Sequence, residues 1–82
     1  MPFTVYILFS ESHKRHYIGQ TMDINNRIQR HNAGFEKATA PYKPWVILWT
    51  TVKANRAEAM ALEKKLKNLS TKRLIQFIIK YA

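Results

Sequence analysis

Phe3-Thr-Val-Tyr-Ile-Leu-Phe9 is followed, after the polar stretch from Ser10 to Arg15, by a second short run, Tyr17-Ile18-Gly19. β-branched and aromatic residues dominate both runs, and this composition is typical of strands. The polar stretch between them has the composition of a turn. The two runs therefore predict a β-hairpin with a long turn.

A helix and a loop are expected after the hairpin. Thr21 or Asp23 can cap a helix that begins near Met22. Gly34 offers the left-handed stop at which such a helix ends. The segment 35–44 contains two prolines and shows neither a helical nor a strand period, which indicates a loop.

The second half of the chain predicts one strand and two helices. The apolar run 45–52 predicts a strand that is buried on both faces. Asn55 and Glu58 make a capping-box-like start for a helix that runs to about Asn68. Ser70 can cap a last helix, whose apolar stripe needs a surface to pack on. That stripe consists of Leu74, Phe77, Ile78 and Tyr81. We therefore expect an α+β fold in the order β-β-α-β-α-α, with a small, mostly antiparallel, three-stranded sheet flanked by helices.

The chain is short and strongly basic. Its 82 residues predict a single domain spanning 1–82, because a chain of this length buries only about two-thirds of its unfolded surface. Fourteen Lys and Arg against five Asp and Glu give a net charge of +9, which favours a polyanionic partner such as nucleic acid. A membrane surface is the competing partner. It is not expected, because the lysines are spread along the chain and not gathered beside one apolar face.

Two features that the sequence lacks exclude some kinds of site and some cellular locations. The chain has no cysteine, so neither a disulfide framework nor a thiolate zinc site can form. The first six residues lack the features of a signal peptide, and no apolar run approaches about 18 residues. We therefore expect neither export nor membrane insertion, and a cytoplasmic location.

The hairpin is expected to bring two tyrosines together. Tyr6 and Tyr17 lie on adjacent strands, where cross-strand neighbours are within about 5.5 Å. At period 2, Tyr6 shares a face with Thr4 and Leu8, opposite to Val5, so it need not belong to the core. A tyrosine in a strand is also an ordinary core or surface aromatic, but two phenols could face one site.

The first predicted helix carries a cation and an imidazole. Arg27 and His31 are four residues apart, so they project from one face and can reach one phosphate. Alternatively, they are a solvated arginine and a histidine near a helix end. They share their face with Ile24 and Ile28, which indicates that it turns inward, and an inward arginine needs an anion.

The second predicted helix carries a carboxylate in a segment otherwise rich in lysine. Glu63 lies at the border of the apolar stripe and should be partly buried. It could simply pair with Lys67 at i+4. It could also bind a hard cation such as Mg²⁺, which keeps several waters and takes few protein ligands. A metal, an arginine and phenols can together provide the base and the charge stabilisation that phosphodiester cleavage needs.

The other aromatic and basic residues predict a contact surface. The aromatic residues Trp45, Trp49, Phe35 and Tyr42 are more often core or loop anchors than stacking platforms, although Tyr42 could stack on an unpaired base. His13 and His16 are phosphate contacts at most. The residues expected to contact nucleic acid are Lys14, Arg15, Gln20, Arg30, Asn32, Tyr42, Lys43 and Lys67.

In its order and spacing of motifs, nearly the whole chain resembles the GIY-YIG endonuclease domain, in its small free-standing bacterial form. This form is related to the N-terminal nuclease domain of the excinuclease subunit that makes the first incision in DNA repair. The resemblance rests on Val5-Tyr6-Ile7 and Tyr17-Ile18-Gly19, on Arg27 with His31-Asn32, and on Glu63 with Lys67.

The resemblance implies a metal-dependent DNA endonuclease. Glu63 would bind Mg²⁺ or Mn²⁺, and Tyr6 or Tyr17 would be the general base, with a slight preference for Tyr6. Arg27 would stabilise charge on the scissile phosphate, and His31 would orient a tyrosine hydroxyl or the phosphate.

Two positions depart from the family pattern, and two other functions stay open. Val5 replaces the first glycine of the name motif, and Gln20 stands where some repair-type relatives carry a lysine that assists the tyrosine. The charge alone would equally support a non-catalytic nucleic-acid-binding module on the same scaffold. The apolar last helix leaves open docking on a larger repair or mobile-element protein, and a homodimer is also possible. Single-stranded, branched and duplex DNA are all possible substrates.

Overall fold

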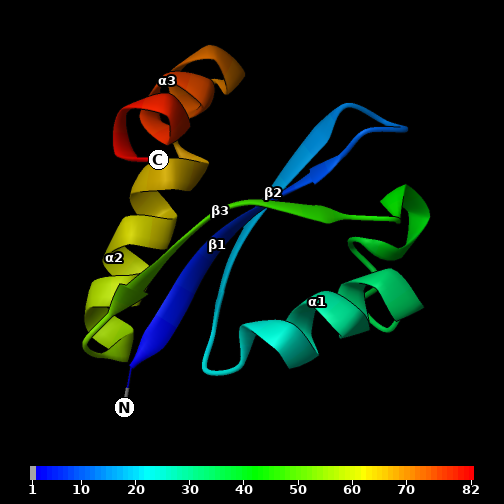
Figure 1. Cartoon of the computed structure of the whole chain (residues 1–82), viewed down its shortest axis with the longest axis horizontal. Coiled ribbons are helices and arrows are strands. Elements are labelled where there is room, and N and C mark those ends of the chain that lie inside the picture. The colour runs from blue at the N-terminus through cyan, green and yellow to red at the C-terminus, as the bar shows by residue number, and fades with distance from the viewer. Residues whose placement is uncertain (1) are drawn as a thin grey trace.

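The structure, a computed structural model that describes residues 2–82, is a three-stranded sheet with three α-helices (Figure 1). Its elements are β1 (Phe3–Ser10), β2 (Arg15–Thr21), α1 (Ile24–Ala33), the short 3₁₀ helix η1 (Ala40–Tyr42), β3 (Val46–Lys53), α2 (Arg56–Lys67) and α3 (Thr71–Tyr81). The expected α+β class and the order β-β-α-β-α-α are confirmed.

All strand pairs in the sheet are antiparallel, and the strand order is β2-β1-β3. β1 is therefore central, and β2 and β3 form the two edges. In the β1–β2 register, Tyr6 lies opposite Gly19 and Leu8 lies opposite Tyr17. Because residues two apart share a face of a strand, Tyr6 and Tyr17 are diagonal neighbours on the same face of the sheet.

Helices cover the sheet on both sides (Figure 1). The face toward α2 and α3 buries Val5, Ile7, Ile18, Ala59, Leu66 and Leu74. The face toward α1 buries Tyr6, Leu8 and Trp45, with Ile24 and Ile28 of α1 packed against them. Tyr6 is only 1% exposed, so the expectation that it need not belong to the core is wrong. The reason is that α1 and Trp45 close the second face of the central strand.

β3 also differs from expectation. It was expected to be buried on both faces, but it is an edge strand with several exposed apolar side chains. These are Val46 (54% exposed), Ile47 (43%), Leu48 (43%) and Val52 (65%). An apolar run does not reveal whether its strand is central or at an edge, and here β3 is an edge strand.

The helix boundaries follow from local capping. The side chain of Asp23 accepts a hydrogen bond from the Asn26 amide at 3.1 Å, and Gly34 ends α1 in the left-handed region with φ 83°. Asn55 caps α2 and Ser70 caps α3, each through its side-chain oxygen. Between residues 2 and 82, no helix is long and apolar enough to cross a membrane.

The last helix packs as its stripe predicts, except at its end. Leu74 is buried in the core, and Phe77 and Ile78 pack against it. The side chain of Tyr81 remains 54% exposed. Its backbone carbonyl accepts a hydrogen bond from Trp49 Nε1 at 3.1 Å, which ties the C-terminal turn of α3 to β3.

Candidate active site at the β2 edge

The functional side chains converge on the edge strand β2. Tyr17 faces α1, whereas Gln20, which pairs with Val5, faces α2. Gln20 Nε2 donates to Glu63 Oε1 of α2 at 3.2 Å. Gln20 also lines a surface cleft together with Arg27 of α1. Because α1 and α2 lie on opposite faces, the free edge of β2 is where their side chains meet.

Three of the candidate catalytic residues form one aromatic cluster. The ring centroids of Tyr6 and Tyr17 are 6.3 Å apart, and that of His31 lies 5.9 Å from Tyr6 and 5.0 Å from Tyr17. The hydroxyl of Tyr6 is 3.0 Å from His31 Nε2, and Thr39 Oγ1 is 2.8 Å from His31 Nδ1. His31 and Thr39 are each 1% exposed. The imidazole is therefore held from both sides in a closed pocket.

Gly19 makes room for the Tyr6 ring. A Cβ at Gly19 would lie 2.5 Å from the Tyr6 hydroxyl oxygen and 2.6 Å from Cζ, so no larger residue fits there without moving the phenol. The site needs this glycine, although only its place in the motif was noted from the sequence. An isolated glycine inside a strand is a recognised signal of such a close approach.

Burial sets the protonation of the cluster. It raises the pKa of Tyr6 well above its usual value of 10.0, with the neighbouring Tyr17 and Glu63 raising it further and Arg27 lowering it. Burial also lowers the pKa of His31 from its ordinary 6.5, opposed by Glu36. At neutral pH Tyr6 is therefore a protonated phenol and His31 a neutral imidazole.

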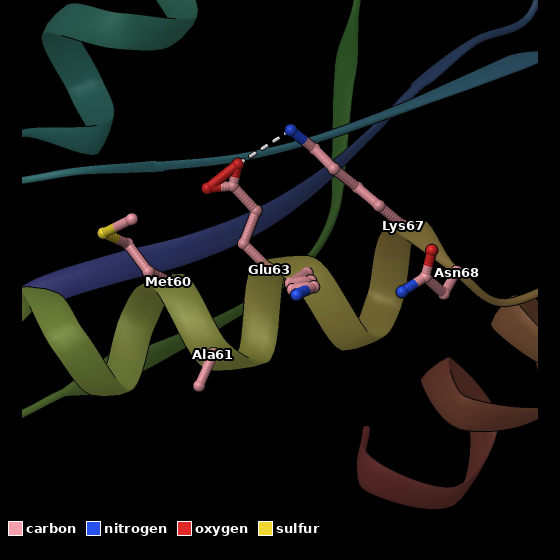
Figure 2. A pocket seen from close by; sticks show the side chains of 6 residues that line it. Met60, Ala61, Glu63, Lys67 and Asn68 are labelled. Atoms are coloured by element: carbon pink, nitrogen blue, oxygen red, sulfur yellow. Dashed lines mark ion pairs between the residues drawn. The ribbon is translucent and has the colours of Figure 1, made fainter.

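Glu63 is partly buried, as expected, with 18% of its side chain exposed. Its Oε2 pairs with Lys67 Nζ at 2.8 Å, and both side chains project from the same side of α2 (Figure 2). Lys67 also lines a second cleft, of about 420 Å³, together with Tyr17, Lys14 and Arg15. Lys67 therefore connects the carboxylate on α2 to the basic cleft beside Tyr17.

Several residues expected to contact nucleic acid are engaged within the protein. Both polar atoms of the Asn32 amide bond the backbone of Trp45, at 3.1 and 2.6 Å, so Asn32 fixes the loop before β3. Arg30 Nε pairs with Glu36 Oε1 at 3.0 Å. The Asn32 assignment is corrected, because a loop contact that the sequence did not reveal occupies both polar atoms of its amide. The Arg30 assignment stays a prediction, because its side chain is 45% exposed and a surface ion pair exchanges easily.

The aromatic residues in and near the loop were expected to be core or loop anchors, and this holds for only some of them. Trp45 is a core residue with 4% exposure, whereas Phe35 is 69% exposed and anchors nothing in the core. The guanidinium of Arg15 lies 4.4 Å from the ring centroid of Tyr42, and His13 meets the same ring edge-on at 5.1 Å. The ring of Tyr42 is thus already stacked by the Arg15 guanidinium. Lys14, Arg15 and Lys43 are exposed and accessible to a polyanion.

The antiparallel sheet thus carries two tyrosines on one face, with an arginine of α1 and a carboxylate of α2 beside its β2 edge. The GIY-YIG catalytic domain matches residues 2–76. The chain belongs to the GIY-YIG family, whose domain is typically a nuclease, and the resemblance noted in the sequence is confirmed.

The fold is shared with a solved bacterial protein. The chain is similar to the solution NMR structure of the UPF0213 protein BH0048 from Bacillus halodurans, with 32% identity and a TM-score of 0.62. The similarity covers 95% of this chain and 83% of that one. No curated protein matches the chain.

The residues around Glu63 fit the divalent cation that the family implies. Hard cations such as Mg²⁺ bind carboxylate and amide oxygens and retain several waters. Gln20 Oε1 is a buried oxygen for which no hydrogen-bond partner is found within residues 2–82, and the amide of Gln20 touches the Glu63 carboxylate. Over the same residues, no group of three or more His, Cys, Asp or Glu side chains could hold a metal. The donor set is therefore one carboxylate with an adjacent amide, which suits a largely hydrated ion.

Proposed function

We propose that the chain is a divalent-metal-dependent endonuclease that hydrolyses DNA phosphodiester bonds. The observation that carries this proposal is the position of Glu63. A half-buried carboxylate lies beside a basic cleft that also contains Tyr17 and Lys67. A carboxylate repels a phosphate unless a cation stands between them, so a protein that only binds DNA gains nothing from this arrangement.

The basic cleft accounts for a nucleic-acid substrate. Lys14, Arg15 and Lys67 line it, and Tyr17 forms part of its wall. Exposed ammonium and guanidinium groups neutralise backbone phosphates and release their counterions. A DNA strand lying in this cleft would run along β2, the edge strand that carries Tyr17.

Within this proposal Tyr17 is the general base, in place of the slightly preferred Tyr6. A general base must reach the proton that it abstracts and must release its own beforehand. Tyr6 is buried, its pKa is raised, and its hydroxyl is bonded to His31. Tyr17 is only partly buried, and it lies on the edge strand that borders the cleft. Tyr6 instead has a structural role, because its buried hydroxyl bonds His31.

The other residues stabilise charge. A phenol with a pKa near 10 is a weak base at neutral pH unless nearby cations stabilise its phenolate, and Arg27 on α1 is the candidate for that role. A divalent cation held by Glu63, with the Gln20 amide beside it, would supply positive charge at the scissile phosphate. Lys67 would then leave Glu63 and pair with a DNA phosphate.

The test is a cleavage assay with labelled single-stranded, duplex and flapped DNA in Mg²⁺, Mn²⁺ or EDTA. The variant is Glu63→Gln, and its matched control is Glu11→Gln, the same chemical change at an exposed residue of the β1–β2 turn. We expect cleavage by the wild type and by the control, and none in EDTA or by Glu63→Gln. Cutting that survives EDTA would refute the metal requirement. DNA binding with a steep salt dependence but no cutting would favour the binding module.

A further inference from the structure

A buried loop threonine has no role in the function described so far. Thr39 precedes η1 and is 1% exposed. Its Oγ1 lies 2.8 Å from His31 Nδ1, and it also donates to the Glu36 carbonyl at 3.4 Å. His31 Nε2 in turn lies 3.0 Å from the Tyr6 hydroxyl. One chain of hydrogen bonds therefore runs from the loop backbone to the phenol.

The direction of this chain follows from the protonation of its members. Tyr6 keeps its proton, because burial raises its pKa, and a buried O–H needs an acceptor. His31 Nε2 is the only partner that the described residues offer this hydroxyl. His31 is neutral and carries a single N–H, so Nε2 accepts and the proton resides on Nδ1. The Thr39 oxygen accepts that N–H, because the threonine's own proton is donated to Glu36.

We propose that Thr39 is a positioning residue that fixes the tautomer of His31 and thereby holds Tyr6 as a neutral, immobile hydrogen-bond donor. Because its hydroxyl proton is donated to His31, Tyr6 is fixed in position and cannot act as the general base in place of Tyr17. Tyr17, whose ring centroid is 5.0 Å from that of His31, is then the tyrosine left free to act. The catalytic part of this inference rests on the proposed nuclease function, whereas the hydrogen-bond part does not.

The backbone of Thr39 is anchored separately from its side chain. Trp45 Nε1 donates to the Thr39 carbonyl at 3.0 Å, and the Thr39 amide donates to the Glu36 carbonyl at 3.1 Å. A change confined to the Thr39 hydroxyl should therefore leave the loop in place. Thr39→Val keeps the shape and removes the acceptor, and Thr39→Ser keeps the acceptor.

The first experiment needs no catalysis. The ¹⁵N shifts of the His31 ring nitrogens report which one is protonated. We expect protonated Nδ1 and bare Nε2 in the wild type and in Thr39→Ser. In Thr39→Val the Nδ1–H would face no acceptor, so we expect the proton to move to Nε2. A wild-type spectrum with the proton on Nε2 would overturn the proposal, and so would an unchanged tautomer in Thr39→Val.

The second experiment separates positioning from binding. Thr39→Val should lower kcat on the order of 10-fold with KM nearly unchanged, and Thr39→Ser should restore it. An unaltered kcat in a Thr39→Val protein whose tautomer has changed would overturn the catalytic part. If the wild type cuts no DNA but the tautomers behave as expected, the nuclease proposal fails while the assignment of Thr39 to His31 stands.

Discussion

The two helices that reach the β2 edge contribute opposite kinds of chemistry. On the α1 side, Tyr6, His31 and Thr39 are at most 1% exposed, uncharged and joined by direct hydrogen bonds. On the α2 side, Glu63 and Lys67 are charged, with 18% and 53% of their side chains exposed. One half of the site is closed and the other half is open to solvent.

This contrast assigns a structural role to the α1 side of the site and a reactive role to the α2 side. A buried polar group that loses its partner costs its full desolvation penalty, so the α1 network favours a single arrangement. A solvent-exposed ion pair contributes little and exchanges easily, so Glu63 can give up Lys67 for a cation. Changes on the α2 side should therefore affect activity first, and changes on the α1 side should affect stability as well.

The sharpest contrast is expected from Glu63→Gln. Loss of the cation's only charged ligand should reduce cleavage by about a thousandfold, because metal charge stabilisation contributes several kcal/mol. Thermal unfolding should change little, since the glutamine oxygen can still accept from Gln20 Nε2 and the lost ion pair has a half-exposed lysine partner. Cleavage rates and unfolding midpoints measured beside Glu11→Gln test both parts. A strongly lowered midpoint would place Glu63 with the structural half of the site.

Substitutions of the two tyrosines should show the same division, with one affecting activity and the other affecting stability. Tyr17→Phe should lower kcat on the order of 100-fold as expected for a lost general base, with little change in the unfolding midpoint. Tyr6→Phe should cost about 1–3 kcal/mol of stability, because it leaves His31 Nε2 buried without a partner. Tyr81→Phe, a change at a 54% exposed residue of α3, is the control for removal of a phenol hydroxyl. If Tyr6→Phe abolished cleavage at unchanged stability, the roles would have to be exchanged.

Much of the fold was predictable because its signals are local. Asp23, Asn55 and Ser70 cap helices through neighbouring residues, so the sequence contains all that is needed to locate these starts. The burial of β3 was not predictable, because its apolar run does not encode its neighbours in the sheet. Its edge position follows from the order β2-β1-β3.

The candidate site was predictable in its members but not in their roles. The helix spacing of Arg27 and His31, and the odd carboxylate Glu63, were visible in the sequence. The burial of Tyr6 depends on how α1 packs, and Thr39 meets His31 from an irregular loop with no periodic pattern. Contacts made by loops are the ones that local reasoning misses.

A steric change can test the closed half without altering its polar groups. Gly19→Ala would bring a Cβ to 2.5 Å from the Tyr6 hydroxyl oxygen and should destabilise the protein by about 1–3 kcal/mol through overpacking. The Tyr6–His31 hydrogen bond should weaken, which NMR of the His31 ring would detect. Gly34→Ala is the matched control, because it strains the left-handed end of α1 (φ 83°) and its Cβ would meet Lys43 and Ala40 instead of Tyr6. Equal effects on His31 from both variants would contradict a specific role for Gly19.

The smallest effect is expected from pH, and it tests the neutral state of the closed half. Burial lowers the pKa of His31 below 6.5 in the folded protein, so below about pH 6.5 the unfolded chain binds a proton that the folded state refuses. Stability should therefore be complete above pH 6.5 and fall as the pH drops toward 5. Burial lowers the pKa of His16 in the same direction. The Glu36 carboxylate titrates below its ordinary 4.5, outside this window.

Unfolding midpoints between pH 7.5 and 5 separate these contributions. His31→Gln should lose part of the pH dependence, and His16→Gln should lose another part. His13→Gln, a change at an exposed turn residue, should keep the wild-type slope. If the slope were unchanged in His31→Gln, the imidazole would already accept a proton in the folded state. The α1 half of the site would then carry charge, and the contrast with the α2 half would disappear.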